Sequence, residues 1–166
     1  MSETLLEVKG LKTHFFLDEG TVRAVDGVDF SVKRGKTLGI VGESGCGKSV
    51  SAFSILQLVG PPGEIIGGEL LLHRRDELSG ATDVVDIAAM KSSSEELRQI
   101  RGNEIAMIFQ EPMTSLSMMH TVGFQIMEAI LLHFQIGKEE ARERAIEMLR
   151  KVGIPKPEQR VDDYPF

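Results

Sequence analysis

The sequence predicts an α/β fold in which an antiparallel β layer precedes an α/β core and a helical region. Residues 5–36 alternate apolar and polar side chains as strands do, around a turn at Asp18-Glu19-Gly20. Two short apolar runs, residues 37–41 and 105–109, lack this alternation and are typical of strands buried on both faces. Beyond residue 120 the apolar side chains recur at helical spacing, which indicates a helical region.

The composition is that of a soluble globular protein, with 42% apolar and 27% charged residues among 166. A net charge of −6 and a pI near 5.3 argue against a dedicated nucleic-acid binder. The single cysteine, Cys46, excludes a disulfide framework and most zinc sites. We expect a protein of the reducing cytosol, because the sequence shows no signal-peptide pattern and no run of about 18 apolar residues.

The β layer contains four short strand patterns. They cover residues 5–9, 12–17, 21–25 and 28–32, and in the last of these the apolar side chains alternate with polar ones. The α/β core then begins with the apolar run at 37–41, followed by a loop and a helix over 48–59. Gly60-Pro61-Pro62-Gly63 ends that helix, and strands are expected at 69–72 and, more weakly, at 84–87.

Three further helices are expected. One begins after Ser92-Ser93-Ser94, where hydroxyl side chains cap a helix and acidic residues follow in the first turn. A second covers 122–132, and a third covers 138–152. Ion pairs at spacing i,i+4 line the outer face of the third helix. Its expected apolar face consists of Ala141, Ala145, Met148, Leu149 and Val152.

The strongest chemical signal is a loop that fits the pattern G-x-x-x-x-G-K-[ST]. It consists of Gly42, Glu43, Ser44, Gly45, Cys46, Gly47, Lys48 and Ser49. Its glycines let consecutive backbone N–H groups point into one concavity, and the following helix adds its positive N-terminal end. Lys48 would reach the β- and γ-phosphates of a nucleotide, and the Ser49 hydroxyl would coordinate Mg²⁺. The alternative is a glycine-rich strand-to-helix turn with an exposed lysine.

The residues around this loop resemble the ATP-binding subunits of ABC transporters, and most closely those of peptide and nickel importers. The segments that carry the resemblance are residues 24–30, 35–49 and 98–116. The resemblance implies a P-loop NTPase core of the ABC type that binds ATP and Mg²⁺ and couples hydrolysis to import of peptides or similar solutes. It implies permease subunits and a second ATP-binding subunit, identical or different, as partners at the cytoplasmic face of the membrane, and no nucleic acid.

Two more site residues follow from the resemblance. Gln110 matches the glutamine that ligates Mg²⁺ and senses the γ-phosphate in this family, and it joins Lys48 as a catalytic candidate. An amide suits this role because it offers both an oxygen for a hard cation and a donor. Phe15 lies where the family carries an aromatic that stacks on adenine, although the neighbouring Phe16 is an alternative and either ring suits ordinary packing.

The sequence departs from the family pattern after Gln110. Ser117-Met118 stands where Asn-Pro is common, and Phe124 stands at a usually polar position. Both lie in the region that meets the membrane partner, so partner fit is less determined than nucleotide binding. The methionines nearby suit either an adaptable docking surface or helix packing. They are Met113, Met118, Met119 and Met127.

The chain ends soon after Tyr164-Pro165, where the family continues with a Ser-Gly-Gly signature, an Asp-Glu strand end and a switch histidine. We therefore expect a partial domain: a β layer over 1–36, a core through Gln110 over 37–112, and a helical region over 113–166. Such a chain would bind ATP weakly at best and would not turn it over, and its central sheet would have an unpaired edge and exposed apolar surface. The alternative is a truncated, non-hydrolytic nucleotide-binding or partner-binding module. A small-molecule kinase is disfavoured by the Phe109–Pro112 segment.

Overall fold

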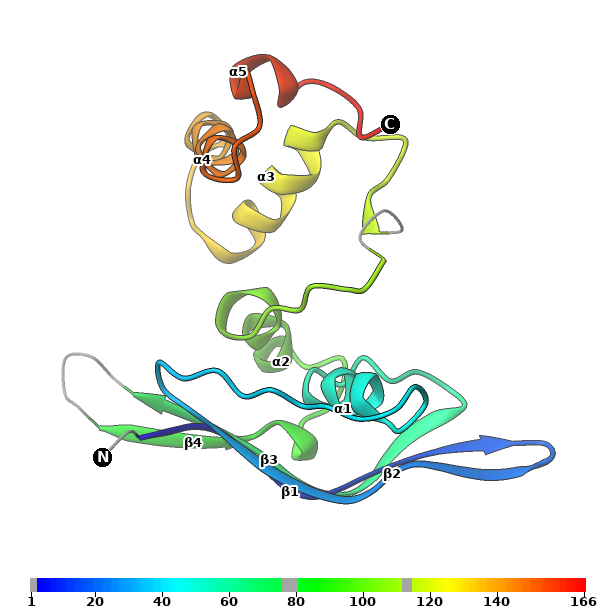
Figure 1. Cartoon of the computed structure of the whole chain (residues 1–166). Coiled ribbons are helices and arrows are strands. Elements are labelled where there is room, and N and C mark those ends of the chain that lie inside the picture. The colour runs from blue at the N-terminus through cyan, green and yellow to red at the C-terminus, as the bar shows by residue number, and fades with distance from the viewer. Residues whose placement is uncertain (1–2, 76–80, 112–114) are drawn as a thin grey trace. The chain divides into compact units, whose positions relative to one another are not determined.

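A computed structural model describes residues 3–75, 81–111 and 115–166 (Figure 1). The chain divides into two compact units, Met1–Leu97 and Arg98–Phe166, which are considered separately below. The first unit contains the sheet and the glycine-rich loop. The second contains Gln110 and the C-terminal helices.

The sheet of the first unit has four antiparallel strands in the order β2-β1-β3-β4. They are β1 (Thr4–Leu17), β2 (Gly20–Lys33), β3 (Gly63–Arg75) and β4 (Thr82–Asp86). The predicted antiparallel layer is therefore confirmed, but its four short strands are two long ones. The breaks in the sequence pattern correspond to irregular pairing near Gly10 and Thr13, where the register between β1 and β2 shifts. At the first of these sites Asp29 accepts a hydrogen bond from the Gly10 N–H at 2.7 Å.

The core of the first unit lies between the sheet and its helices. Leu11 and Leu70 are fully buried on the sheet. Helix α1 (Lys48–Ile55) lies over this sheet in Figure 1, and the short helix η1 (Ile87–Ala89) follows β4. Asp86 caps η1 by accepting from the Ala88 N–H at 3.0 Å.

The expectation of two buried strands is wrong. Residues 37–41 and 106–109 have no strand pairing among the described residues, and only Ile105 forms an isolated bridge, with Arg101. Val41 is 92% exposed and Ile108 is 96% exposed. An unalternating apolar run favours burial in a parallel sheet, but a strand also needs neighbours, and none is present in the part of the chain that the structure describes. Apolar side chains are exposed in both segments, but the central sheet whose unpaired edge was expected is not formed by the described residues.

Two other element boundaries differ from prediction. Helix α1 ends at Ile55 rather than at residue 59, and Gln57 adopts a left-handed conformation (φ 47°). The Gln57 amide donates to the carbonyls of Ile87 and Met90, which ties the end of α1 to η1. Strand β3 begins at Gly63, six residues earlier than expected, and Gly68 allows its bulged backbone to pass close to β1 within the strand.

The helices of the second unit are η2 (Ile100–Glu104), α3 (Val122–His133), α4 (Lys138–Lys151) and α5 (Pro157–Arg160), while α2 (Glu95–Gln99) spans the boundary. Ser94 caps α2 through the Leu97 N–H at 3.2 Å, as the serine run predicts. The core of this unit is a cluster of Ala145, Leu149 and Val161 against α3, in which Met127 takes part. Met127 is thus a packing residue, whereas Met118 and Met119 are exposed, and Met113 lies outside the described residues.

Helix α4 confirms one part of its prediction and corrects another. The i,i+4 pairs Glu140–Arg144 and Glu147–Lys151 form at 2.6 and 2.9 Å. Ala141, Ala145 and Leu149 are buried, but Met148 is 42% and Val152 is 74% exposed. Periodicity places a side chain on a face without showing how far the neighbouring element covers that face.

No helix among the described residues is long and apolar enough to cross a membrane.

Candidate nucleotide-phosphate site

The glycine-rich loop joins the extended residues 37–41 to α1. Gly45 and Gly47 have φ values of 83° and 89°, a left-handed conformation that favours glycine. Gly47 is also confined in space, since a Cβ there would lie 2.3 Å from the carbonyl oxygen of Ala24 on β2. The motif glycine next to the lysine is therefore required twice, by its conformation and by the close approach of β2.

Lys48 is the first residue of α1, and its ammonium group lies inside the loop. Its Nζ donates to the carbonyl oxygens of Gly42 and Glu43 at 2.7 and 2.6 Å, and lies 3.4 Å from Cys46 Sγ. The loop thus wraps around a positive charge. A Cβ on Gly42 would lie 2.7 Å from Cys46 Sγ, so this glycine leaves room for the cysteine side chain.

The start of α1 is open to an anion. No side chain caps it at Gly47, and no acidic residue occupies its first turn. The first N–H groups of a helix have no intrahelical acceptor, and the helix dipole makes this end positive. Phosphate oxygens match both features, which is the arrangement that the motif predicts.

Among the three serines at this helix, Ser49 alone leaves its hydroxyl uncommitted within the described structure. Ser51 and Ser54 donate to the carbonyls of Gly47 and Val50 at 3.0 and 2.7 Å. Ser49 is exposed in the first turn, beside Lys48. Its hydroxyl fits a Mg²⁺ ion that takes most of its ligands from phosphate and water. The described residues contain no group of three or more His, Cys, Asp or Glu that would hold a metal without phosphate.

The two candidate stacking rings differ in exposure. Phe15 is half-buried, and its Cε1 would lie 2.6 Å from a Cβ on Gly63, so its ring covers that glycine. Phe16 is 48% exposed, and its N–H donates to the Pro62 carbonyl at 2.9 Å. The assignment of adenine stacking to Phe15, with Phe16 as the alternative, stays a prediction.

Gln110 belongs to the second unit and is exposed. Glu111 follows it, and the next three residues, Pro112 to Thr114, lie outside the described residues. Sequence reasoning does not single out Gln125, which makes several hydrogen bonds to the loop before α3. A glutamine inside a helix carries no recognisable signal of such a role.

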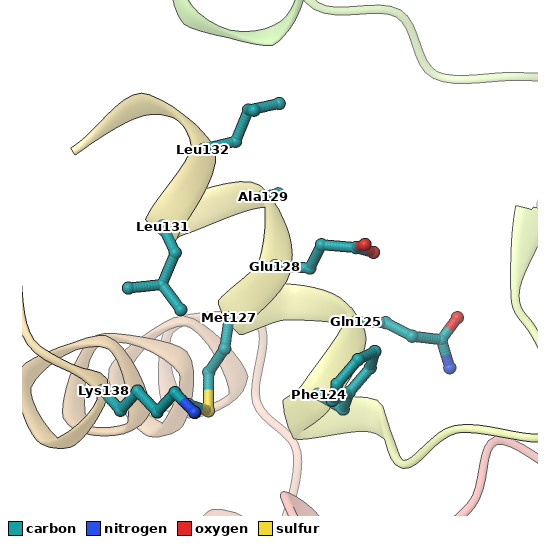
Figure 2. A pocket seen from close by; sticks show the side chains of 8 residues that line it. All are labelled: Phe124, Gln125, Met127, Glu128, Ala129, Leu131, Leu132 and Lys138. Carbon is teal, nitrogen blue, oxygen red and sulfur yellow. The ribbon is translucent and has the colours of Figure 1, made fainter. Parts of the chain in front are cut away.

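An apolar groove of about 690 Å³ follows α3 (Figure 2). Its lining residues are Phe124, Gln125, Met127, Glu128, Ala129, Leu131, Leu132 and Lys138. Figure 2 shows Met127 and Leu131 on the side of α3 toward Lys138, with Gln125 and Glu128 on the opposite side. Phe124, which departs from the family pattern, is 51% exposed and stacks on His120 at 4.7 Å between ring centroids. The groove contains no group suited to phosphate other than Lys138.

Residues 25–165 match the ABC transporter family. The chain is 48% identical over 165 residues to a probable peptide ABC transporter ATP-binding protein of Sinorhizobium fredii, covering 99% of this chain and 46% of that protein. It is 45% identical to the oligopeptide transport ATP-binding protein AppD of Bacillus subtilis, covering 98% of this chain and 46% of the relative. The dipeptide transport ATP-binding protein DppD of Escherichia coli is also 45% identical, over 97% of this chain and 46% of its own length. The chain spans about half the length of these relatives.

The fold is also similar to that of a solved bacterial ABC transporter cassette, MJ0796, whose structure is dimeric. The TM-score is 0.76 at 21% identity, covering 97% of this chain and 62% of that one. A second structure of the same cassette, bound to ADP and Pi, gives a TM-score of 0.75 at the same identity and coverage. The chain therefore belongs to the ABC transporter family, with the fold of its ATP-binding cassette.

Proposed function

We propose that these residues form the nucleotide-binding part of an ATP-binding subunit that couples ATP hydrolysis to the import of peptides or similar solutes. The observation that carries the proposal is the Lys48 ammonium group held in a glycine-lined loop at an uncapped helix start. The names of three relatives, which are peptide, oligopeptide and dipeptide transport proteins, support the solute class.

The residues of the loop would contact different parts of the nucleotide. Backbone N–H groups from Gly42 to Lys48, including those of Glu43, Ser44, Gly45, Cys46 and Gly47, would surround the phosphates. Lys48 would exchange its two carbonyl partners for β- and γ-phosphate oxygens, and Phe15 would stack on the adenine. Ser49 and Gln110 would ligate Mg²⁺. When bound, this ion neutralises charge on the phosphate oxygens.

Turnover needs more than this loop. These 166 residues contain no Ser-Gly-Gly, and none of the four histidines follows an apolar strand pattern that ends in Asp-Glu. We propose that a polypeptide of only these 166 residues binds Mg·ATP weakly at best and does not hydrolyse it, because its sequence contains no long apolar strand pattern ending in the Asp-Glu that would supply a carboxylate to activate water. If the competing function, a non-hydrolytic binding module, is correct, even a longer chain that contains these residues would not hydrolyse ATP.

The partners would be permease subunits and a second ATP-binding subunit, at the cytoplasmic face of the membrane. The relatives' names as transport proteins and the dimeric cassette support this assignment. Within the chain, we propose that residues 1–36 flank the adenine, 37–112 carry phosphate and Mg²⁺, and 113–166 belong to the partner-facing helical region.

Equilibrium binding tests the proposal. Mg·ATP should bind the 166-residue chain, and Lys48→Ala should weaken binding roughly 10- to 100-fold, since charge-assisted hydrogen bonds are worth about 1.5–3 kcal/mol. Lys36→Ala is the matched control, because Lys36 is exposed just before the loop and should not change the affinity. Equal affinity of the Lys48→Ala and unchanged chains, or no binding at all, would overturn the proposal. The ATPase and the non-hydrolytic module are separated by a turnover assay. If a longer chain that contains these residues hydrolyses ATP and the 166 residues alone do not, the protein is an ATPase.

A further inference from the structure

Gly63 lies directly beside Phe15 in the sheet of the first unit. It is the first residue of β3, and Phe15 on β1 is its partner in the antiparallel pairing of the two strands. The Gly63 N–H donates to the Gly60 carbonyl at 2.9 Å, which closes the turn before β3. The Phe16 N–H donates to the Pro62 carbonyl at 2.9 Å, which holds that turn against β1. These bonds fix the backbone of Gly63 relative to that of Phe15.

The ring of Phe15 occupies the space where a side chain at Gly63 would lie. A Cβ at Gly63 would be 2.6 Å from Cε1 and 2.9 Å from Cδ1 of Phe15, and 2.6 Å from Cγ1 of Val59. Gly63 is buried and the two side chains over it are half-buried, so they shield the glycine from solvent. The φ of Gly63 is outside the left-handed region, so glycine is required here by space alone.

The ring of Phe15 leans toward β3 and away from β2. On β2 the residue opposite Phe15 is Val22, which is 51% exposed. Side chains that are directly opposite share one face of a sheet, with Cβ atoms about 4.5–5.5 Å apart. A ring that leaned toward β2 would therefore cover Val22, and the high exposure of Val22 indicates that the ring does not. The side of Phe15 that faces β2 is left open.

The phosphate loop also lies at β2. Gly47 approaches this strand at Ala24, whose carbonyl oxygen would be 2.3 Å from a Cβ on the glycine. Ala24 is two residues from Val22, which is no more than about 7 Å along a strand. A nucleotide with its phosphates in the loop would extend along β2, and its base would meet the open side of the Phe15 ring.

We infer that Gly63 is a positioning residue for Phe15: because it has no side chain, the ring rests over β3 and the space beside β2 is free for the base. This inference rests on the proposed function, in which Phe15 stacks on the adenine. A side chain at residue 63 would push the ring toward Val22, into the space of the base. Phosphate binding at Lys48 would not change.

Equilibrium titration of the 166-residue chain with two ligands tests this inference. Mg·ATP and magnesium tripolyphosphate both present a triphosphate chain, but only Mg·ATP has a base. Gly63→Ala should weaken Mg·ATP binding roughly 5- to 100-fold, which corresponds to one base stacked on an aromatic ring. It should leave the affinity for tripolyphosphate unchanged, and Phe15→Ala should show the same pattern. Gly60→Ala is the matched control from the same turn, because a Cβ there would have no atom within 4 Å, and it should change neither affinity.

A double variant separates the ring contact from a general loss of stability. When Gly63→Ala is combined with Phe15→Ala, Mg·ATP should bind as it does to Phe15→Ala alone, because the ring that Gly63 positions is gone. Additive losses in the double variant would overturn the inference. Unchanged Mg·ATP affinity in Gly63→Ala would overturn it as well. Equal weakening of both ligands in Gly63→Ala would show damage to the fold rather than a role at the base, and so contradict the inference.

Two other outcomes concern the proposed function itself. If the unchanged chain binds neither ligand, the proposed phosphate site is wrong. If Phe15→Ala binds Mg·ATP as tightly as the unchanged chain does, the assignment of adenine stacking to Phe15 fails, and the inference about Gly63 fails with it. A failure of the inference alone is recognised by a loss of Mg·ATP affinity in Phe15→Ala that Gly63→Ala does not reproduce.

Discussion

The hydroxyl groups of Thr13 on β1 and Ser54 on α1 lie 2.7 Å apart, and both residues are fully buried. Ser54 also donates to the Val50 carbonyl at 2.7 Å, so Thr13 is the donor to Ser54. The helix that begins at the phosphate loop is thereby attached to the central strand of the sheet. Phe15 lies two residues beyond Thr13 on the same strand, which links the expected adenine contact to the same anchor.

A double-mutant cycle should show that this pair is coupled. Ser54→Ala leaves the buried Thr13 hydroxyl without an acceptor and should lower the free energy of unfolding by about 1–3 kcal/mol. Thr13→Val should cost less, because Ser54 keeps its bond to Val50. The double variant should be more stable than the sum of the single effects predicts, measured by urea unfolding. Strict additivity would contradict the coupling.

Three glycines of the loop region should respond differently to alanine. Gly39→Ala should change stability little, because its Cβ would meet open space at an ordinary φ. Gly45→Ala should cost about 1–2 kcal/mol from its left-handed backbone alone. Gly47→Ala should cost more than Gly45→Ala and displace α1 from β2, since its Cβ would lie 2.3 Å from the Ala24 carbonyl oxygen.

Thermal unfolding with calorimetry gives these three values, and Mg·ATP titration gives the effect on the site. The ranking Gly39, Gly45, Gly47 is the critical outcome. A Gly47→Ala variant as stable as Gly45→Ala would show that β2 yields easily and that the close approach is unimportant.

The exposed apolar segment before the loop should tolerate charge. Val41 is 92% exposed, so Val41→Lys should alter the free energy of unfolding by no more than about 0.5 kcal/mol. Leu70 is fully buried, and Leu70→Ala should cost about 2–5 kcal/mol. Val41→Lys should also reduce binding of a hydrophobic dye such as ANS. A loss of stability comparable to Leu70→Ala would mean that residues 37–41 are packed.

The Glu147–Lys151 pair on α4 predicts a specific pH dependence. The hydrogen bond and charge of Lys151 lower the pKa of Glu147 below its ordinary value of 4.5. A lowered pKa in the folded state stabilises the fold above the unfolded pKa, and this contribution disappears as the pH falls through the folded value. Glu147→Gln should therefore reduce the unfolding temperature at pH 7, and the difference should shrink below about pH 4.5.

Glu143→Gln is the control for this measurement, because it removes a carboxylate of the same helix that has no ion pair among the described residues. A difference between Glu147→Gln and the unchanged chain that grows at low pH would contradict the predicted sign.

Local signals predicted much of the fold and of the backbone geometry of the candidate phosphate site. The turn at Asp18-Glu19-Gly20, the serine cap before α2 and the loop glycines each depend on a few neighbouring residues, and each is present as expected. Residues 37–41 could not be predicted in the same way, because an apolar run shows a tendency toward burial but does not provide a strand to pair with. The Gln125–Ser117 contact was also beyond prediction, since it depends on how a loop returns to its own helix.

The bonds of Lys48 to Gly42 and Glu43 have a consequence for the kinetics of ligand entry. The ammonium group donates to two carbonyls of the loop and so joins its first two residues to α1, which reduces the conformational entropy that the loop would lose on binding a ligand. Under the proposed function, an incoming phosphate would replace these two neutral acceptors with charged ones at a cation already in place. Phosphate capture would then be an exchange of hydrogen-bond partners at Lys48 and would not require the loop to fold around the ligand.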